Sequence, residues 1–112
     1  GFEPQLNLAE DEYRNPDVLL HPRSIRVHDV RGATALLVIE IARSSLEYDL
    51  SVKAETYAGF GVREYWVVNA LTRETTVFRS PDAEARQFAG GRQAVRLRQF
   101  VDTQGWNDAL RP

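Results

Sequence analysis

Glu40 has the most unusual surroundings of any charged residue in the sequence. It follows the apolar residues 37–39 and precedes Ile41, a run typical of a strand buried on both faces in the middle of a sheet. An unpaired carboxylate there costs on the order of several kcal/mol, so Glu40 needs a cation, a metal ion or a strand end open to solvent. The alternative to a functional role is a buried ion pair with an arginine such as Arg43 or Arg63.

Asp17 is a second carboxylate that the fold could bring to Glu40. It follows Pro16 and precedes the short apolar run 18–20, which would pair beside the strand of Glu40. Two carboxylates on adjacent strands, without a His or Cys, make a hard oxygen site suited to Mg²⁺ or Mn²⁺. Because Pro-Asp pairs are also common in turns, a turn or cap aspartate is the alternative for Asp17.

Lys53 is the only lysine among the 14 lysine and arginine residues. It lies one turn into the helix expected after Glu40, from which its side chain could reach back over the strand end. A compact ammonium orients or deprotonates an attacking water better than a guanidinium does. The alternative is an exposed pair with Asp49 four residues earlier, worth roughly 0.2–0.5 kcal/mol. Tyr57, one turn further on, could add a hydroxyl to the same rim or belong to the core.

The remaining candidate groups give weaker indications. His21 lies four residues after Asp17, but Pro22 argues against a continuing strand, so we expect His21 at the surface; His28 has no recognisable partner. A basic segment near the C-terminus could hold a phosphate backbone if it lay beside the metal site, and is otherwise a solvated strand face. Its members are Arg86, Arg92, Arg96 and Arg98. The sequence has no Ser-His-Asp order, phosphate-binding glycine loop or zinc-ligand spacing.

The apolar patterning locates the elements that must position these side chains. We expect short strands at residues 5–8 and 18–20, joined by an acidic turn at residues 10–12, and a central strand at residues 35–42. Ser44 and Glu47 have the spacing of a capping box and Asp49 is a second possible cap, so a helix should begin within residues 44–50. Its expected buried stripe is Leu46, Leu50, Ala54, Tyr57 and Ala58, and its expected end is at Gly59 and Gly61.

The second half of the chain predicts further strands. Residues 65–68 and 75–78 should form a hairpin, and Gly90-Gly91 should turn a last hairpin with residues 94–97 as its second arm. The resulting order β-β-β-α-β-β predicts an α/β (α+β) fold, with one mixed sheet and a packed helix. We expect residues 1–112 to form a single domain, in which residues 99–112 are a loosely attached tail.

The composition limits the function classes. A length of 112 residues, with 43% hydrophobic and 27% charged residues, is that of one globular domain. The net charge of -2 argues against a protein that coats nucleic acid, but it allows an enzyme that meets phosphates through a local patch and a bound metal. The lack of cysteine excludes disulfides and thiol nucleophiles, and it fits a reducing cytoplasm. The longest apolar stretch, residues 35–39, is too short to cross a bilayer.

Several of these residues together resemble the Uma family, a bacterial family of restriction endonuclease-like proteins in the PD-(D/E)XK nuclease superfamily. The resemblance covers residues 16–78. It rests on the Pro16-Asp17-Val18 run, residues 37–41, Tyr48-Asp49 followed by Lys53, Tyr57, and residues 61–62 and 64–68. The segment from Glu40 to Trp66 is the specific part.

The resemblance implies a restriction endonuclease-like core with Asp17, Glu40 and Lys53 as catalytic residues. Asp17 and Glu40 would bind Mg²⁺ or Mn²⁺, with the main-chain carbonyl of Ile41 as a further ligand. Most of the superfamily has its lysine two residues after the acid, where this chain has Ala42; in the Uma pattern the lysine lies in the following helix, at the place of Lys53.

Two departures from the family pattern bear on activity. The residues after the central strand are Arg43-Ser44-Ser45 where family members tend to have Ser-Pro-Ser, which would alter the loop into the helix. Family members also usually carry a helical segment before the first strand, so the resemblance implies that this N-terminal helical part is missing here.

Two functions follow as hypotheses. The first is an Mg²⁺-dependent endonuclease that hydrolyses phosphodiester bonds of DNA. The second is a catalytically inactive nuclease-like module that binds nucleic acid or a protein, in which a homodimer would bury the exposed sheet edge.

Overall fold

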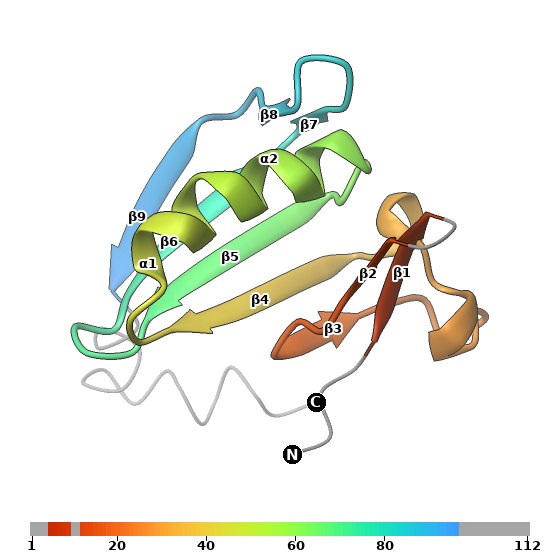
Figure 1. Ribbon diagram of the computed structural model, residues 1–112, viewed down its shortest axis with the longest axis horizontal. Helices are drawn as coiled ribbons and strands as arrows, with labels where there is room; N and C mark the ends of the chain where they lie inside the picture. The colour runs from red at the N-terminus through yellow and green to blue at the C-terminus, as the bar shows by residue number, and fades with distance from the viewer. Residues whose placement is uncertain (1–4, 10–11, 97–112) are drawn as a thin grey trace.

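A mixed five-stranded sheet forms the centre of the protein (Figure 1). The computed structural model describes residues 5–9 and 12–96. The strand order is β3-β4-β5-β6-β9, in which β4 and β5 are parallel and the other neighbours antiparallel. The bounds are Val18–Leu20 for β3, Leu37–Ala42 for β4, Glu64–Asn69 for β5, Glu74–Arg79 for β6 and Arg92–Arg96 for β9. The predicted α/β (α+β) class is therefore confirmed.

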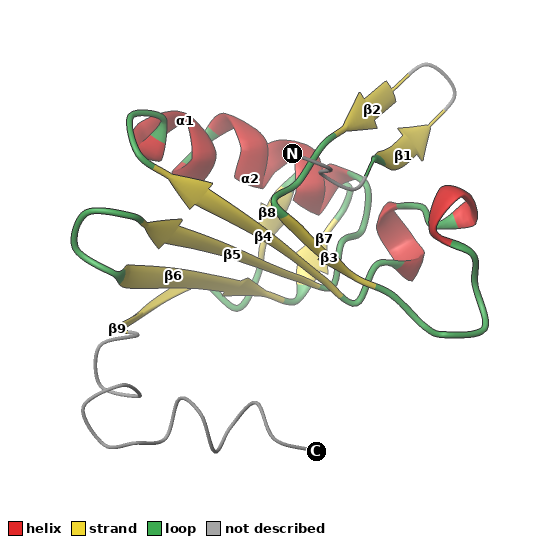
Figure 2. Ribbon diagram, turned by 90° about the horizontal axis from the view of Figure 1, so that it is seen from below, coloured by secondary structure: helices red, strands yellow, loops and turns green. Residues whose placement is uncertain are grey.

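Two consecutive helices cross from β4 to its parallel neighbour β5. They are α1 (Leu46–Leu50) and α2 (Val52–Gly59), and Figure 2 shows both on one side of the sheet. The expected buried stripe is confirmed, since Ala54, Tyr57 and Ala58 belong to the core and Leu46 and Leu50 pack against it. Among the described residues no helix is long and apolar enough to cross a membrane.

The helical segment differs from the prediction at its start and in its middle. The N-cap is Ser45 and its side chain makes no capping bond, so the capping box expected from Ser44 and Glu47 does not form. The Ser45 hydroxyl donates instead to the Asp49 side chain. Ser51, with φ -116° and ψ -78°, separates α1 from α2. The predicted end is confirmed, because α2 stops at Gly59 and Gly61 has a positive φ of 78°.

The expectation that β4 is buried on both faces is wrong. Val38, Glu40 and Ala42 are buried on the face that carries the helices, whereas Ile41 on the opposite face is 49% exposed. The reason is that α1 and α2 cover one face only, and alternate strand residues point to opposite faces. Glu40 lies on the covered face, so the cost of burying its carboxylate still applies.

The N-terminal strands pair differently from the prediction. A further strand, β2 (Glu12–Arg14), begins at the last residue of the expected acidic turn and pairs with β1 (Leu6–Ala9). These two strands form a separate ribbon, and β1 does not join the main sheet. Strand propensity identifies an extended segment but not its partner, which the burial of Leu6 and Leu8 in the core decides here.

The end of the described chain also corrects a prediction. Gly90 and Gly91 do not turn a hairpin, because β8 (Gln87–Phe88) pairs with β7 (Pro81–Asp82) while β9 pairs with β6. The predicted β5–β6 hairpin is confirmed. The tail expected at residues 99–112 lies outside the described residues.

An aromatic cluster joins the helices to the sheet. The Tyr65 ring on β5 lies 4.8 Å from that of Tyr57 on α2 and 5.6 Å from that of Phe78 on β6, centroid to centroid. Phe88 extends the cluster, 5.6 Å from Phe78. Pairs at such distances add about 0.5–1.5 kcal/mol each beyond their burial, so the cluster fixes α2 over β5.

The short 3₁₀ turn at Gly32–Thr34, just before β4, packs against the end of α2. Gly32 lies directly against the main chain of Phe60, the residue that caps α2. There is no room at Gly32 for a side chain. This contact therefore joins the turn that leads into β4, the strand of Glu40, to the end of α2, the helix of Lys53.

Gly32→Ala tests this contact. The added methyl group would overlap the Phe60 main-chain oxygen, and we expect the free energy of unfolding to fall by about 1–3 kcal/mol in urea denaturation. Ala33→Ser, at an exposed position of the same turn, should change it by less than about 0.5 kcal/mol. Equal stability of Gly32→Ala and the unmodified protein would contradict the close approach.

Candidate active site

The pairing of β3 with β4 brings Asp17 to Glu40. Val18 pairs with Ile39 in this antiparallel register, so Asp17, one residue earlier, comes level with Glu40. The Asp17 Oδ2 accepts a hydrogen bond of 2.7 Å from the main-chain N–H of Ile41. This bond holds the Asp17 carboxylate against β4, beside the residue whose carbonyl is a candidate metal ligand.

Glu40 is paired from the helix above it. Glu40 is only 4% exposed. Its Oε2 accepts a hydrogen bond of 3.1 Å from the Lys53 ammonium and one of 3.0 Å from the Tyr57 hydroxyl. Lys53 and Tyr57 are one turn apart on α2, so both point to the same end of β4. The structure thus brings Asp17, Glu40, Lys53 and Tyr57 together. The partner of Glu40 is Lys53, and not Arg43 or Arg63, which are exposed.

Asp49 is a member of this group that the sequence did not reveal. An exposed pair with Lys53 was the alternative that the sequence offered, but Asp49 is 2% exposed and its Oδ1 lies 3.4 Å from the Lys53 Nζ. Its Oδ2 accepts from the Ser45 hydroxyl at 2.8 Å, and its main-chain oxygen accepts from the Tyr65 hydroxyl at 2.8 Å. Its spacing of four from both Ser45 and Lys53 was the available signal. Asp49 therefore places a second carboxylate beside the Lys53 ammonium.

The electrostatics of the group reflect its burial. Burial raises the pKa of Glu40 above its usual value, although Lys53 and the Tyr57 hydroxyl act to lower it, and the charge of Asp17 raises it further. Burial acts to lower the pKa of Lys53, but Glu40 and Asp49 outweigh it and the pKa is raised. Burial and the neighbouring Glu40 raise the pKa of Tyr57 so far that its hydroxyl stays protonated as a donor. Lys53 is thus held as an ammonium between two carboxylates.

The other sequence candidates lie away from this group. The His21 Nδ1 is 2.9 Å from the main-chain oxygen of its neighbour Pro22, and the exposed His28 is 3.8 Å from Asp29. Arg86 lies in the turn between β7 and β8, and Arg92 is the first residue of β9. Both are across α2 from Lys53. The Arg96 side chain and Arg98 are outside the described part of the chain.

The donor set fits a hard divalent cation. In the described ranges 5–9 and 12–96, no three or more His, Cys, Asp or Glu side chains gather into a metal-binding cluster. Mg²⁺ does not require one, because it commonly takes one or two carboxylates and keeps several waters. Asp17, Glu40 and the Ile41 carbonyl could supply three oxygens at the end of β4. The residues present are therefore compatible with Mg²⁺ or Mn²⁺.

A comparison with protein-family models shows to which family this chain belongs. The family model Uma2, described as "Putative restriction endonuclease", matches residues 1–109. The chain belongs to the Uma2 family. The match extends well beyond residues 16–78, on which the resemblance rested, and the mixed sheet with its helices is consistent with a restriction endonuclease-like fold. No curated protein matches the chain.

Membership in Uma2 suggests nuclease activity for the chain. The geometry fits one feature that the resemblance implies, a lysine in the helix that follows the strand of Glu40. The Lys53 ammonium reaches Glu40 from α2, 13 positions later in the sequence. The position two residues after Glu40 is Ala42, which is 1% exposed beneath the helices.

Lys53→Met should destabilise this Uma2 protein when divalent metal is removed by a chelator. The change leaves the buried Glu40 and Asp49 without a cation, and we expect a loss of about 2 kcal/mol or more, reduced from the value of a fully buried pair because Lys53 is 26% exposed. Urea denaturation measures it. Arg79→Met, which breaks an exposed pair with Glu64, is the control and should cost less than about 1 kcal/mol. Similar losses in both variants would contradict a stabilising role of Lys53.

Proposed function

We propose that this Uma2 protein is a metal-dependent endonuclease that hydrolyses phosphodiester bonds of DNA. The observation that carries the proposal is the meeting of a buried carboxylate, Glu40, with a lysine from α2 and with Asp17 from the neighbouring strand. Acids and a cation that converge at a strand end are the parts that phosphoryl hydrolysis needs.

Each side chain has a role in this proposal. Asp17, Glu40 and the Ile41 carbonyl would hold Mg²⁺ or Mn²⁺, which when bound supplies Lewis-acid stabilisation of the scissile phosphate and makes hydroxide available at neutral pH. Lys53, held as an ammonium by Glu40 and Asp49, would orient the attacking hydroxide and stabilise the charge that develops on the phosphoryl oxygens. Tyr57 would fix the orientation of the Glu40 carboxylate through its hydrogen bond.

The bond changes are those of a hydrolysis. Hydroxide attacks phosphorus, the bond from phosphorus to one ester oxygen breaks, and the leaving oxygen takes a proton from solvent. The products are one phosphate monoester end and one free hydroxyl end. No covalent intermediate with the protein is needed, which agrees with the lack of cysteine and of a Ser-His-Asp arrangement.

Cleavage of plasmid DNA in the presence of Mg²⁺ or Mn²⁺ tests the proposal. We expect Asp17→Asn, Glu40→Gln and Lys53→Ala each to lower the rate by a factor of about 100 or more, since each removes charge from the transition state. Arg79→Ala and Glu64→Gln, which alter an exposed ion pair on β5 and β6, should cut like the unmodified protein. Equal residual cleavage by the unmodified protein and the three site variants would overturn it, since that result indicates a contaminating nuclease.

A catalytically inactive nuclease-like module remains the second candidate function. The net charge of -2 favours it, as does the small number of acids that the described residues bring together. Such a module would bind nucleic acid or a protein, or pair with a second copy through its sheet edge, without using a metal.

Calorimetric titration with Mn²⁺ separates the two functions. The endonuclease proposal expects Mn²⁺ to bind and Asp17→Asn to weaken that binding by a factor of at least 10, because a carboxylate ligand is lost. Asp82→Asn, at an exposed position outside the site, should leave the affinity unchanged. Binding that is absent, or unaffected by Asp17→Asn, would favour the inactive module.

A further inference from the structure

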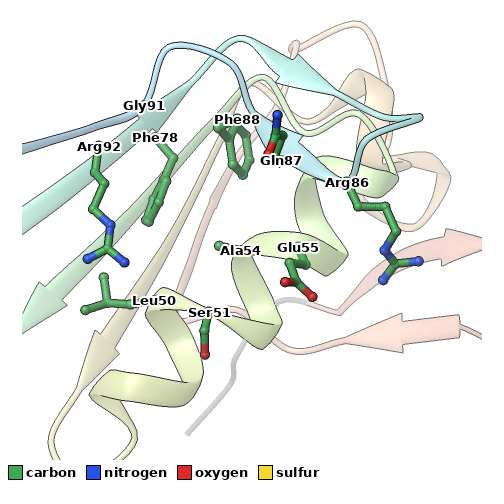
Figure 3. Close-up of a pocket in the computed structure, with 10 residues that line it drawn as sticks. All are labelled: Leu50, Ser51, Ala54, Glu55, Phe78, Arg86, Gln87, Phe88, Gly91 and Arg92. Carbon is green, nitrogen blue, oxygen red and sulfur yellow. The ribbon is translucent and has the colours of Figure 1, made fainter.

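A second concave site lies on the other flank of α2. A pocket of about 370 Å³ opens between α2, β6, β8 and β9 (Figure 3). This volume is at the lower end of the range of about 300–1,000 Å³ that is typical of small-molecule sites. Its floor is apolar, since Ala54, Phe78 and Phe88 line it and all three belong to or border the core.

The pocket is separate from the candidate active site. Lys53 and Tyr57 point from α2 towards β4, where they reach Glu40. Glu55 lines the pocket, and residues two apart on a helix point about 160° away from one another. The helix therefore stands between the two sites, and a group bound in the pocket does not touch the Glu40 carboxylate.

Two arginines lie at opposite ends of the pocket, with the aromatic floor between them (Figure 3). Neither Arg86 nor Arg92 forms an ion pair within the part of the chain that the structure describes. The Arg86 side chain packs along Gly59 at the C-terminal end of α2, where a cation is favoured, and Glu55 lines the same end. Arg92 lies at the other end of the pocket, beside Leu50 and away from Glu55 (Figure 3). It is therefore the arginine that can bind an anion.

The net charge of the lining residues indicates the charge of that anion. Two arginines and one glutamate give a net charge of +1, which matches a single negative charge. A polyanionic strand laid through the pocket would meet the Glu55 carboxylate as well as the arginines. A planar carboxylate suits the guanidinium of Arg92, which can bind it through two parallel hydrogen bonds.

We propose that this pocket binds a small organic monocarboxylate with a flat apolar ring. Its carboxylate pairs with Arg92, and its ring lies on the floor formed by Ala54, Phe78 and Phe88. This binding site is independent of the candidate active site, and the proposal does not require that the Glu40 group cuts DNA.

Calorimetric titration with naphthoate, a flat aromatic carboxylate, tests this site. Two fragments serve as matched probes: acetate carries the charge without the ring, and naphthalenemethanol carries the ring without the charge. We expect naphthoate to bind at least tenfold more tightly than either fragment. Arg92→Gln should weaken naphthoate at least tenfold, Arg92→Lys should weaken it less, and Arg79→Gln, an exposed strand arginine outside the pocket, should leave it unchanged.

Three results would overturn the proposal. These are no binding of naphthoate, equal binding to Arg92→Gln and the unmodified protein, and Arg92-dependent binding of a single-stranded oligonucleotide but not of naphthoate. The last would assign the surface to nucleic acid. A circular dichroism melt of each variant shows that it is folded, and the Mn²⁺ affinity of Arg92→Gln should be unchanged because α2 separates the sites.

Discussion

The ion pair between Lys53 and Glu40 is the interaction on which the arrangement of this domain depends. Glu40 is almost fully buried under the helices, and a carboxylate in that place is costly unless a cation and hydrogen-bond donors accompany it. Lys53 provides the cation and Tyr57 a donor, both to the same oxygen, Oε2. An ion pair so placed adds little stability compared with apolar packing of the same volume, but removal of one partner is strongly destabilising because it leaves a buried charge uncompensated.

Keeping Lys53 in that place constrains the whole helical segment. Asp49 lies one turn before Lys53 and forms a second ion pair with it, while the hydroxyls of Ser45 and Tyr65 donate hydrogen bonds to the Asp49 side chain and main chain. The Ser45 hydroxyl is therefore used on Asp49 and does not cap the helix. The aromatic cluster around Tyr65 then fixes the height of α2 above the sheet, and with it the distance between Nζ and the Glu40 carboxylate.

The sequence predicted the parts of this site that have a local signal. Glu40 was found because a charge in an apolar run is costly, Lys53 because it is the only lysine, and the β5–β6 hairpin because its arms and turn are adjacent in the chain. The burial of Asp49 was not predicted because an i, i+4 pair has the same spacing whether exposed or buried, and only the fold decides which. The β1–β2 ribbon and the pairing of β9 with β6 were missed because strand propensity carries no information about distant partners.

The place of the lysine follows from the packing of β4. Residues 40 and 42 point to the same face of the strand, and that face is covered by the helices. Ala42 is 1% exposed, so a lysine there would have to lay its chain between the sheet and α1, where a small residue now allows the helix to approach. A cation that comes from α2 avoids this conflict, because the Lys53 side chain is 26% exposed and its ammonium alone bonds to Glu40. The same close approach of helix and strand that excludes a lysine at position 42 thus brings Lys53 within hydrogen-bonding distance of Glu40.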